Sequence, residues 1–177
     1  PHHLVLLRLS EDKRLRSALA LPMVSAGKHL LSALVQPMEV LIWDQAAREG
    51  KRAVIIGVPP SYPPRKVNGV CVGCFMTPNS LTDTYTHPAA VTEVITDLVG
   101  EYPVDVKGFR TERKDWLRDE IYAMGRKHFA VVRHFLQHAE WDYFQFVDIG
   151  LDRLQHGFWQ HHDPQHVHYE AGNPYAN

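Results

Sequence analysis

Cysteine is scarce in this chain, and long apolar runs are missing from it. The 177 residues include only Cys71 and Cys74. Two cysteines cannot form the disulfide framework of a small secreted domain, so a reducing compartment, the cytoplasm, is expected. No apolar stretch approaches the roughly 20 residues that cross a bilayer, and the opening run at 4–9 is interrupted by Arg8. The sequence therefore predicts no membrane-spanning segment.

An excess of one charge is also absent. Lysine and arginine number 19 and aspartate and glutamate 20, which gives a formal net charge of −1. This balance indicates neither a nucleic-acid-binding nor an anionic-membrane surface. Apolar residues make up 45% of the chain and charged residues 22%, which is typical of a globular protein and argues against disorder.

The length fits one domain or part of a larger one. Residues 1–37 form a poorly defined N-terminal segment, in which 24–35 is compatible with a short helix that ends before Pro37. Residues 38–177 read as an α/β domain. The chain begins at Pro1 and not at a methionine, so we expect a processed, trimmed or partial protein.

Helical and strand patterns alternate after residue 40. The run AVIIGV at 53–58 is typical of a strand that is buried on both faces. The longest helix is predicted at 113–139, where apolar residues recur at steps of three and four. Further helices are predicted at 43–49 and 87–99, and further strands at 70–76, 104–106 and 141–149. This alternation predicts an α/β fold whose mostly parallel sheet is flanked by helices.

A carboxylate and an imidazole follow the last predicted strand. In open α/β sheets, ligands bind beyond the carboxyl ends of the strands. Asp152 and His156 stand there four residues apart, so a helical turn would direct both side chains to one metal ion. A pair of ligands made of a carboxylate oxygen and an imidazole nitrogen suits Zn²⁺ or Mn²⁺. The same spacing at Asp83 and His87 shows that it also arises by chance, and capping or surface contacts are the alternative.

Other candidate groups favour structural roles. Cys71 and Cys74 form a single CxxC pair in a predicted strand, which favours buried, inert thiols over a redox or zinc pair. His134 and His138 stand one helical turn apart, and a solvated face is favoured over metal binding. Four histidines follow the candidate ligands, namely His161, His162, His166 and His168. We expect this group to pack within a loop, with the mouth of a site or adventitious metal binding as the alternative.

The sequence WDYFQFVDIGLDRLQHGFW at 141–159 resembles the type I phosphodiesterase/nucleotide pyrophosphatase branch of the alkaline phosphatase superfamily. Shorter matches continue over 163–175. Others precede it, with GKR at 50–52, VPPSYPP at 58–64, VNG at 67–69 and FMTP at 75–78. The resemblance covers roughly residues 38–177.

The resemblance implies an alkaline phosphatase-like fold, present here in part. It implies that Asp152 and His156 bind one of two divalent metal ions, with Zn²⁺ expected before Mn²⁺. It also implies a phosphate-ester substrate, attacked by a Thr or Ser nucleophile to form a covalent phospho-enzyme. The nucleophile is not identifiable here. Ser25 lies in the corresponding interval without further support.

In the family, one metal-binding Asp precedes the nucleophile near the N-terminus, and an Asp-His pair and a last His are expected beyond residue 177. On this resemblance part of the site is absent, so we expect the isolated chain to be inactive. One alternative is a non-catalytic remnant or scaffold fragment of the same fold. Another is a related hydrolase that acts on phosphomonoesters, sulfate esters or phosphonates.

Overall fold

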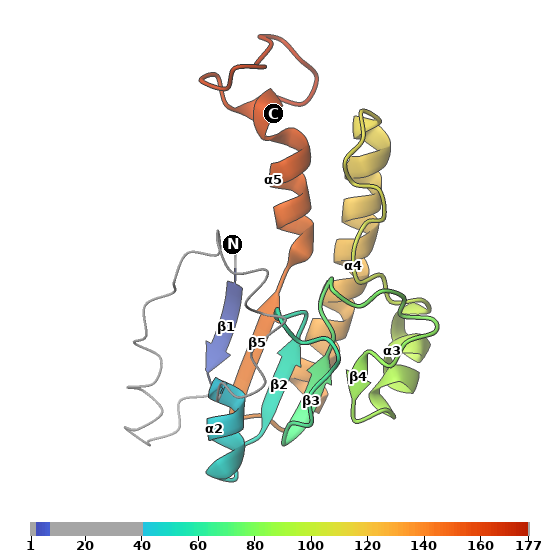
Figure 1. Cartoon of the computed structure of the whole chain (residues 1–177), viewed down its shortest axis with the longest axis vertical. Helices are drawn as coiled ribbons and strands as arrows, with labels where there is room; N and C mark the ends of the chain where they lie inside the picture. Colours follow the sequence, from blue (N-terminus) through green and yellow to red (C-terminus); the bar gives the residue numbers. More distant parts are fainter. Residues whose placement is uncertain (1–2, 8–40, 177) are drawn as a thin grey trace.

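The computed structural model describes residues 3–7 and 41–176, which build one sheet with helices against it (Figure 1). In chain order the elements are β1 (His3–Leu7), α2 (Ile42–Arg48), β2 (Ala53–Ile56), β3 (Gly69–Val72), β4 (Thr86–His87), α3 (Val91–Val99), α4 (Lys114–His138), β5 (Tyr143–Val147) and α5 (Ile149–His162). Among these described helices, none combines the length and the apolar character needed to cross a membrane.

The sheet has the strand order β1-β5-β2-β3-β4. Its three central strands, β5, β2 and β3, run parallel, whereas β1 and β4 pair antiparallel at the two edges. The predicted α/β class is confirmed. The predicted strand at 104–106 is wrong, because these residues belong to the connection between α3 and α4. The two-residue strand β4 was not predicted.

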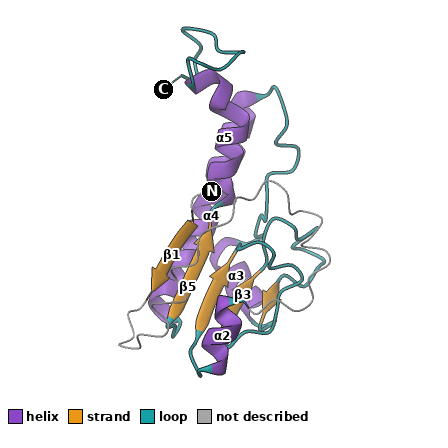
Figure 2. Ribbon diagram, turned by 60° about the vertical axis from the view of Figure 1, so that its left-hand side comes forward, coloured by secondary structure: helices purple, strands orange, loops and turns teal. Residues whose placement is uncertain are grey.

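Strand β2 lies at the centre of the core, as its continuous apolar run predicts. All four of its residues are at most 1% exposed. Val54 and Ile56 pack with residues of α3 and α4 on one face of the sheet. Ile55 packs on the other face with Trp43 of α2. Figure 2 shows these helices on opposite sides of the sheet. A strand with two buried faces needs apolar residues at every position.

Helix α4 contributes residues to two separate hydrophobic clusters. Its 25 residues span about 37 Å at the helical rise of 1.5 Å per residue, which exceeds the length of the strands. Val131 and Phe135, in the C-terminal half, pack against the sheet. Leu117 and Ile121, in the N-terminal half, pack in a second cluster with Ile149 of α5. The N-terminal half therefore extends beyond the sheet, alongside α5 (Figure 1).

Helices α4 and α5 approach closely at a glycine. A Cβ atom on Gly157 of α5 would lie 2.7 Å from Cδ2 of Leu117, whereas a Cβ on Gly125 of α4 would meet no atom within 4 Å. Leu117 is fully buried, so its side chain has little room to move. The absence of a side chain at Gly157 thus allows the two helices to pack.

The two glycines give a matched test of this packing. We expect Gly125→Ala to raise the free energy of unfolding by about 0.5–1 kcal/mol, because alanine favours the helix and no atom obstructs it. We expect Gly157→Ala to lower it by about 1 kcal/mol, because overpacking against Leu117 outweighs the same helical gain. Urea denaturation of both variants measures the difference. A similar gain in both would contradict the close α4–α5 contact.

Candidate metal centre

The start of α5 is determined by the residue that directly follows β5. The Oδ1 atom of Asp148 accepts a hydrogen bond of 2.9 Å from the backbone N–H of Gly150, as expected of an aspartate at a helix N-cap. Asp148 is therefore the carboxylate at the end of the strand, which corrects the expectation that placed Asp152 there. Asp152 lies in the first turn of α5.

Asp152 and His156 lie side by side on α5. Oδ1 of Asp152 is 3.7 Å from Nε2 of His156, and the two side chains are 43% and 63% exposed. This distance is too long for a hydrogen bond. It suits two ligands of one ion, since ligand atoms about 2.1 Å from a tetrahedral Zn²⁺ lie about 3.4 Å apart. The predicted juxtaposition is therefore present, on an accessible face of the helix.

A buried arginine holds the second oxygen of Asp152. Nη1 of Arg153 donates to Oδ2 of Asp152 over 2.6 Å. The same guanidinium donates from Nε to Oδ1 of Asp105 over 2.7 Å and from Nη2 to Oδ2 of Asp105 over 2.6 Å. Arg153 is only 7% exposed. Burial by itself lowers the pKa of Arg153, but the hydrogen bonds and charges of the two carboxylates outweigh burial and raise it.

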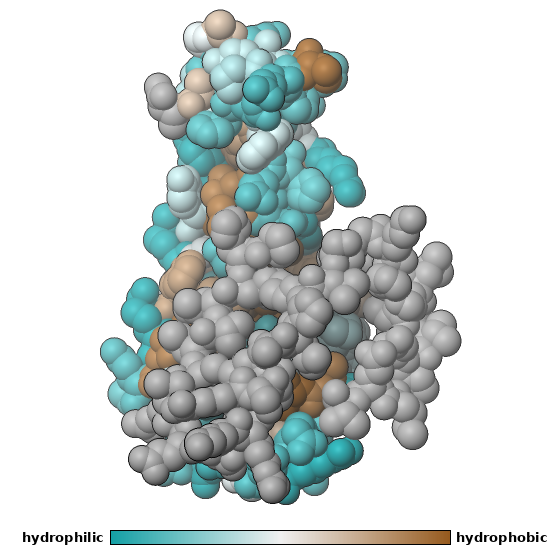
Figure 3. Space-filling model, turned by 90° about the vertical axis from the view of Figure 1, so that its left-hand side faces the viewer, coloured by the Kyte–Doolittle hydropathy of each residue, from teal (hydrophilic) through white to brown (hydrophobic). Residues whose placement is uncertain are grey.

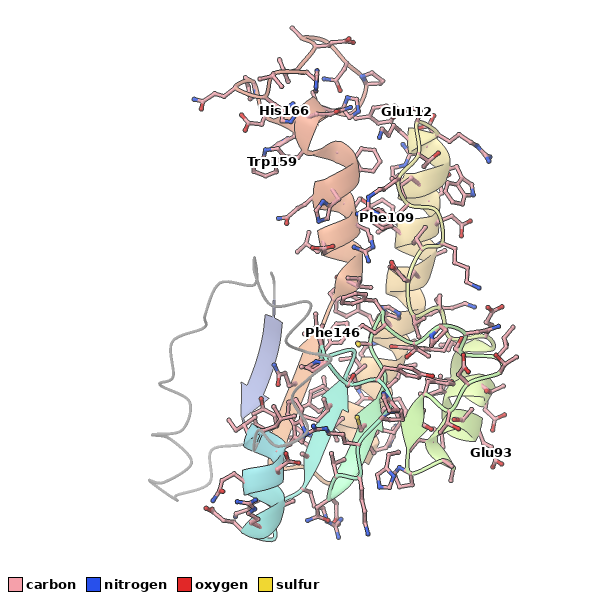
Figure 4. The ribbon with its side chains drawn as sticks, viewed as in Figure 1. Glu93, Phe109, Glu112, Phe146, Trp159 and His166 are labelled. Atoms are coloured by element: carbon pink, nitrogen blue, oxygen red, sulfur yellow. The ribbon has the colours of Figure 1, made fainter. Side chains whose placement is uncertain are left out.

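Aromatic rings surround this ion-pair cluster. The guanidinium of Arg153 lies 4.0 Å from the ring centroid of Phe109 and 5.6 Å from that of Phe75. The ring of Phe109 also packs against that of His156, with the centroids 6.3 Å apart. Figure 4 shows Phe109 in the space between α4 and α5. The connection between α3 and α4 therefore contacts His156 directly and reaches Asp152 only through Arg153.

The described residues supply these two ligands but no third one. Within residues 3–7 and 41–176, no group of three or more His, Cys, Asp and Glu side chains is placed to hold a metal ion. Asp105, the other carboxylate that binds Arg153, has both oxygens in hydrogen bonds with that guanidinium. Ser25 lies outside the described residues.

The cysteines are buried thiols, as the sequence predicted. Cys71 is 2% exposed and Cys74 is 1% exposed, and no disulfide joins them. Burial raises the pKa of Cys71 to about 11. A thiol with this pKa is protonated at neutral pH, which fits a structural role.

Among the described residues, the remaining histidines do not form groups of three or more potential metal ligands. His134 and His138 pack together on α4, with ring centroids 4.8 Å apart, and no third ligand joins them among the described residues. His161 and His162 lie in the last turn of α5 and not in a loop, which corrects the expectation for these two residues. His161 packs on Tyr175, whereas His166 and His168 lie in the loop that follows the helix. Figure 4 shows Trp159 and His166 near the outer end of α5, where the surface is mostly hydrophilic with small hydrophobic patches (Figure 3).

Sequence reasoning missed Asp105, Arg153 and Phe109. Arg153 is adjacent to a predicted ligand, which is a weak local signal. Asp105 and Arg153 are 48 residues apart, and no periodicity connects them. Only the folded connection between α3 and α4 brings them together.

His128 is a buried histidine near the carboxyl ends of the strands. It is 3% exposed, and its Nε2 lies 2.6 Å from the carbonyl oxygen of Pro103. Burial lowers the pKa of His128 despite that hydrogen bond and the charges of Asp148 and Asp105. The imidazole is therefore neutral in the folded protein at neutral pH.

This burial predicts a pH dependence of stability. Below the ordinary histidine pKa of 6.5, the unfolded chain binds a proton that the folded protein binds only at lower pH. The free energy of unfolding therefore falls as the pH drops below about 6.5, by at most about 1.4 kcal/mol per pH unit from this residue. We expect His128→Gln, which keeps a donor for Pro103, to lose less stability than the parent chain between pH 7 and 5. Urea denaturation at both pH values measures this, and equal losses would refute it.

Comparisons of the chain with models of protein families, with curated proteins and with solved structures find no match.

Proposed function

We propose that this chain is part of a metal-dependent phosphohydrolase of the phosphodiesterase/nucleotide pyrophosphatase type. In this proposal, Asp152 and His156 bind one divalent cation, Zn²⁺ or Mn²⁺, of a two-metal site. The observation that carries the proposal is the 3.7 Å separation of the Asp152 and His156 ligand atoms. The sequence resemblance over residues 38–177 supports the choice of reaction.

The donor atoms fit the proposed metal. A carboxylate oxygen with an imidazole nitrogen suits Zn²⁺ and Mn²⁺. Arg153 neutralises one of the two neighbouring aspartates, so the cluster of Asp105, Asp152 and Arg153 retains a net charge of −1, which favours a cation. Metal ions at such a site neutralise the oxygens of the transferred phosphoryl group and lower the pKa of the attacking oxygen.

The residues around the pair define how a substrate approaches. Asp152 and His156 are partly exposed, so their free side faces solvent, where a phosphate ester has access. On the inner side, Phe109 packs against both Arg153 and His156 and keeps water from this part of the cluster. In this proposal, the described residues hold one ion on an exposed face of α5, beyond the carboxyl end of β5.

The main alternative is a non-catalytic fragment or scaffold of the same fold. It is favoured by the presence of only two ligands at this position among the described residues. Catalytic zinc normally has three protein ligands, so two ligands bind a metal weakly. A related hydrolase of phosphomonoesters, sulfate esters or phosphonates would use the same pair, so the pair does not distinguish it from the proposed phosphodiesterase.

Hydrolysis of bis(4-nitrophenyl) phosphate with added Zn²⁺ or Mn²⁺ tests the proposal. We expect no turnover by the 177-residue chain and turnover by a version extended at both ends. We expect Asp152→Ala to lower the activity of the longer version by about 100-fold or more, because it removes a ligand.

The matched control is Asp119→Ala, since Asp119 is an exposed aspartate that pairs with Arg118 on α4. This variant should keep full activity. An inactive longer version would favour the scaffold alternative. Turnover by the 177-residue chain that disappears in Asp152→Ala would show that the described ligands suffice.

A further inference from the structure

The two oxygens of Asp152 have different surroundings. Oδ2 accepts a 2.6 Å hydrogen bond from Nη1 of Arg153, whereas Oδ1 faces Nε2 of His156 at 3.7 Å without a hydrogen bond. A carboxylate held through one oxygen keeps the lone pairs of the other for a cation. The orientation of Asp152 therefore depends on where the guanidinium of Arg153 is fixed.

Arg153 is fixed from the side opposite to Asp152. Asp105 accepts from its Nε and Nη2 in a two-pronged arrangement, the geometry that a planar guanidinium and a carboxylate prefer. The ring of Phe109 lies 4.0 Å from the guanidinium carbon. A long side chain held in this way, at 7% exposure, has few alternative rotamers.

Asp105 is in turn connected to the hydrophobic core. Its Oδ1 also accepts a 2.8 Å hydrogen bond from the backbone N–H of Val106. Val106 is buried in the cluster that contains Leu117 and Ile121 of α4. A continuous series of contacts therefore leads from the hydrophobic core through Asp105 and Arg153 to Asp152.

We infer that Asp105 and Arg153 are positioning residues for metal binding by Asp152 and His156. This inference rests on the proposed function. Asp105 contacts neither candidate ligand directly, yet it controls the guanidinium that orients Asp152. Without the Asp105 carboxylate, Nε and Nη2 of Arg153 become available to Asp152 and compete with the cation for Oδ1. The cluster also loses one negative charge, which weakens its attraction for a cation.

A purely structural role for the ion pair predicts a different result. Buried ion pairs often add little net stability, and removal of one partner usually destabilises the fold. Such a role would change the free energy of unfolding while the metal affinity of the molecules that remain folded stays constant. A positioning role changes that affinity. Mutation of a residue that is hydrogen-bonded to a metal ligand typically lowers the metal affinity by about 10- to 100-fold.

The test is a titration of the full chain with Zn²⁺ alone, followed through the ¹⁵N–¹H imidazole signals of His156, which His156→Gln assigns. The variants are Asp105→Asn, Arg153→Lys and Asp152→Asn, with Asp119→Asn as the matched control. We expect Asp105→Asn and Arg153→Lys to reach half-saturation at a Zn²⁺ concentration at least about 10-fold higher than the parent chain. A lysine keeps the charge but cannot bridge two carboxylates as a guanidinium does. Asp119→Asn should titrate like the parent chain, and Asp152→Asn should lose the response.

Three results would overturn the inference in distinguishable ways. In the first, Asp105→Asn and Arg153→Lys bind Zn²⁺ as tightly as the parent chain, while Asp152→Asn loses the response. This result would support the ligand pair but refute the positioning role. A response that persists unchanged in Asp152→Asn would overturn the proposed metal site itself, and the positioning role with it. If Asp105→Asn does not fold, Arg153→Lys carries the comparison, and unfolding of both would assign the pair to the fold alone.

Discussion

The packing of α5 against the N-terminal half of α4 determines where the candidate metal ligands lie. Strand β5 ends at Val147, and α5 begins at Ile149 and continues away from the sheet (Figure 1). A helix in this direction needs a partner beyond the sheet, and the length of α4 provides one. Gly157 permits the close approach to Leu117. As a consequence, Asp152 and His156 lie on α5 beyond the carboxyl end of β5, on the side of the sheet where α/β proteins usually bind ligands.

The connection between α3 and α4 is the second constraint on this edge. It contributes Asp105, which binds the guanidinium of Arg153, and Phe109, which packs against Arg153 and His156. These contacts link residues that are far apart in the sequence to both candidate ligands. The result is a small polar cluster whose inner side is buried and hydrogen-bonded and whose outer side is open to solvent. Of the two candidate ligands, Asp152 is held by a hydrogen bond from Arg153, whereas His156 is positioned by ring packing alone.

The elements that the sequence predicted correctly are those with a strong local pattern. Helix α4 has a long apolar stripe, and β2 has an uninterrupted apolar run, so both were identified near their observed bounds. The predicted strand at 104–106 failed because three residues give no reliable period, and the Asp105–Arg153 contact holds them in a connection instead. The full length of α5 was not predicted, because Gly150 and Gly157 are poor helix formers and packing on α4 offsets their effect. The spacing of Asp152 and His156 was readable, whereas the pairing of Asp105 with Arg153 exists only in the folded chain.

The most direct test of the account is a crystal of this chain soaked in ZnCl₂, with anomalous diffraction recorded on both sides of the zinc absorption edge. The account predicts a zinc peak between Oδ1 of Asp152 and Nε2 of His156, about 2.0–2.2 Å from each atom. Zinc peaks at the exposed histidines after α5, with none between Asp152 and His156, would contradict it.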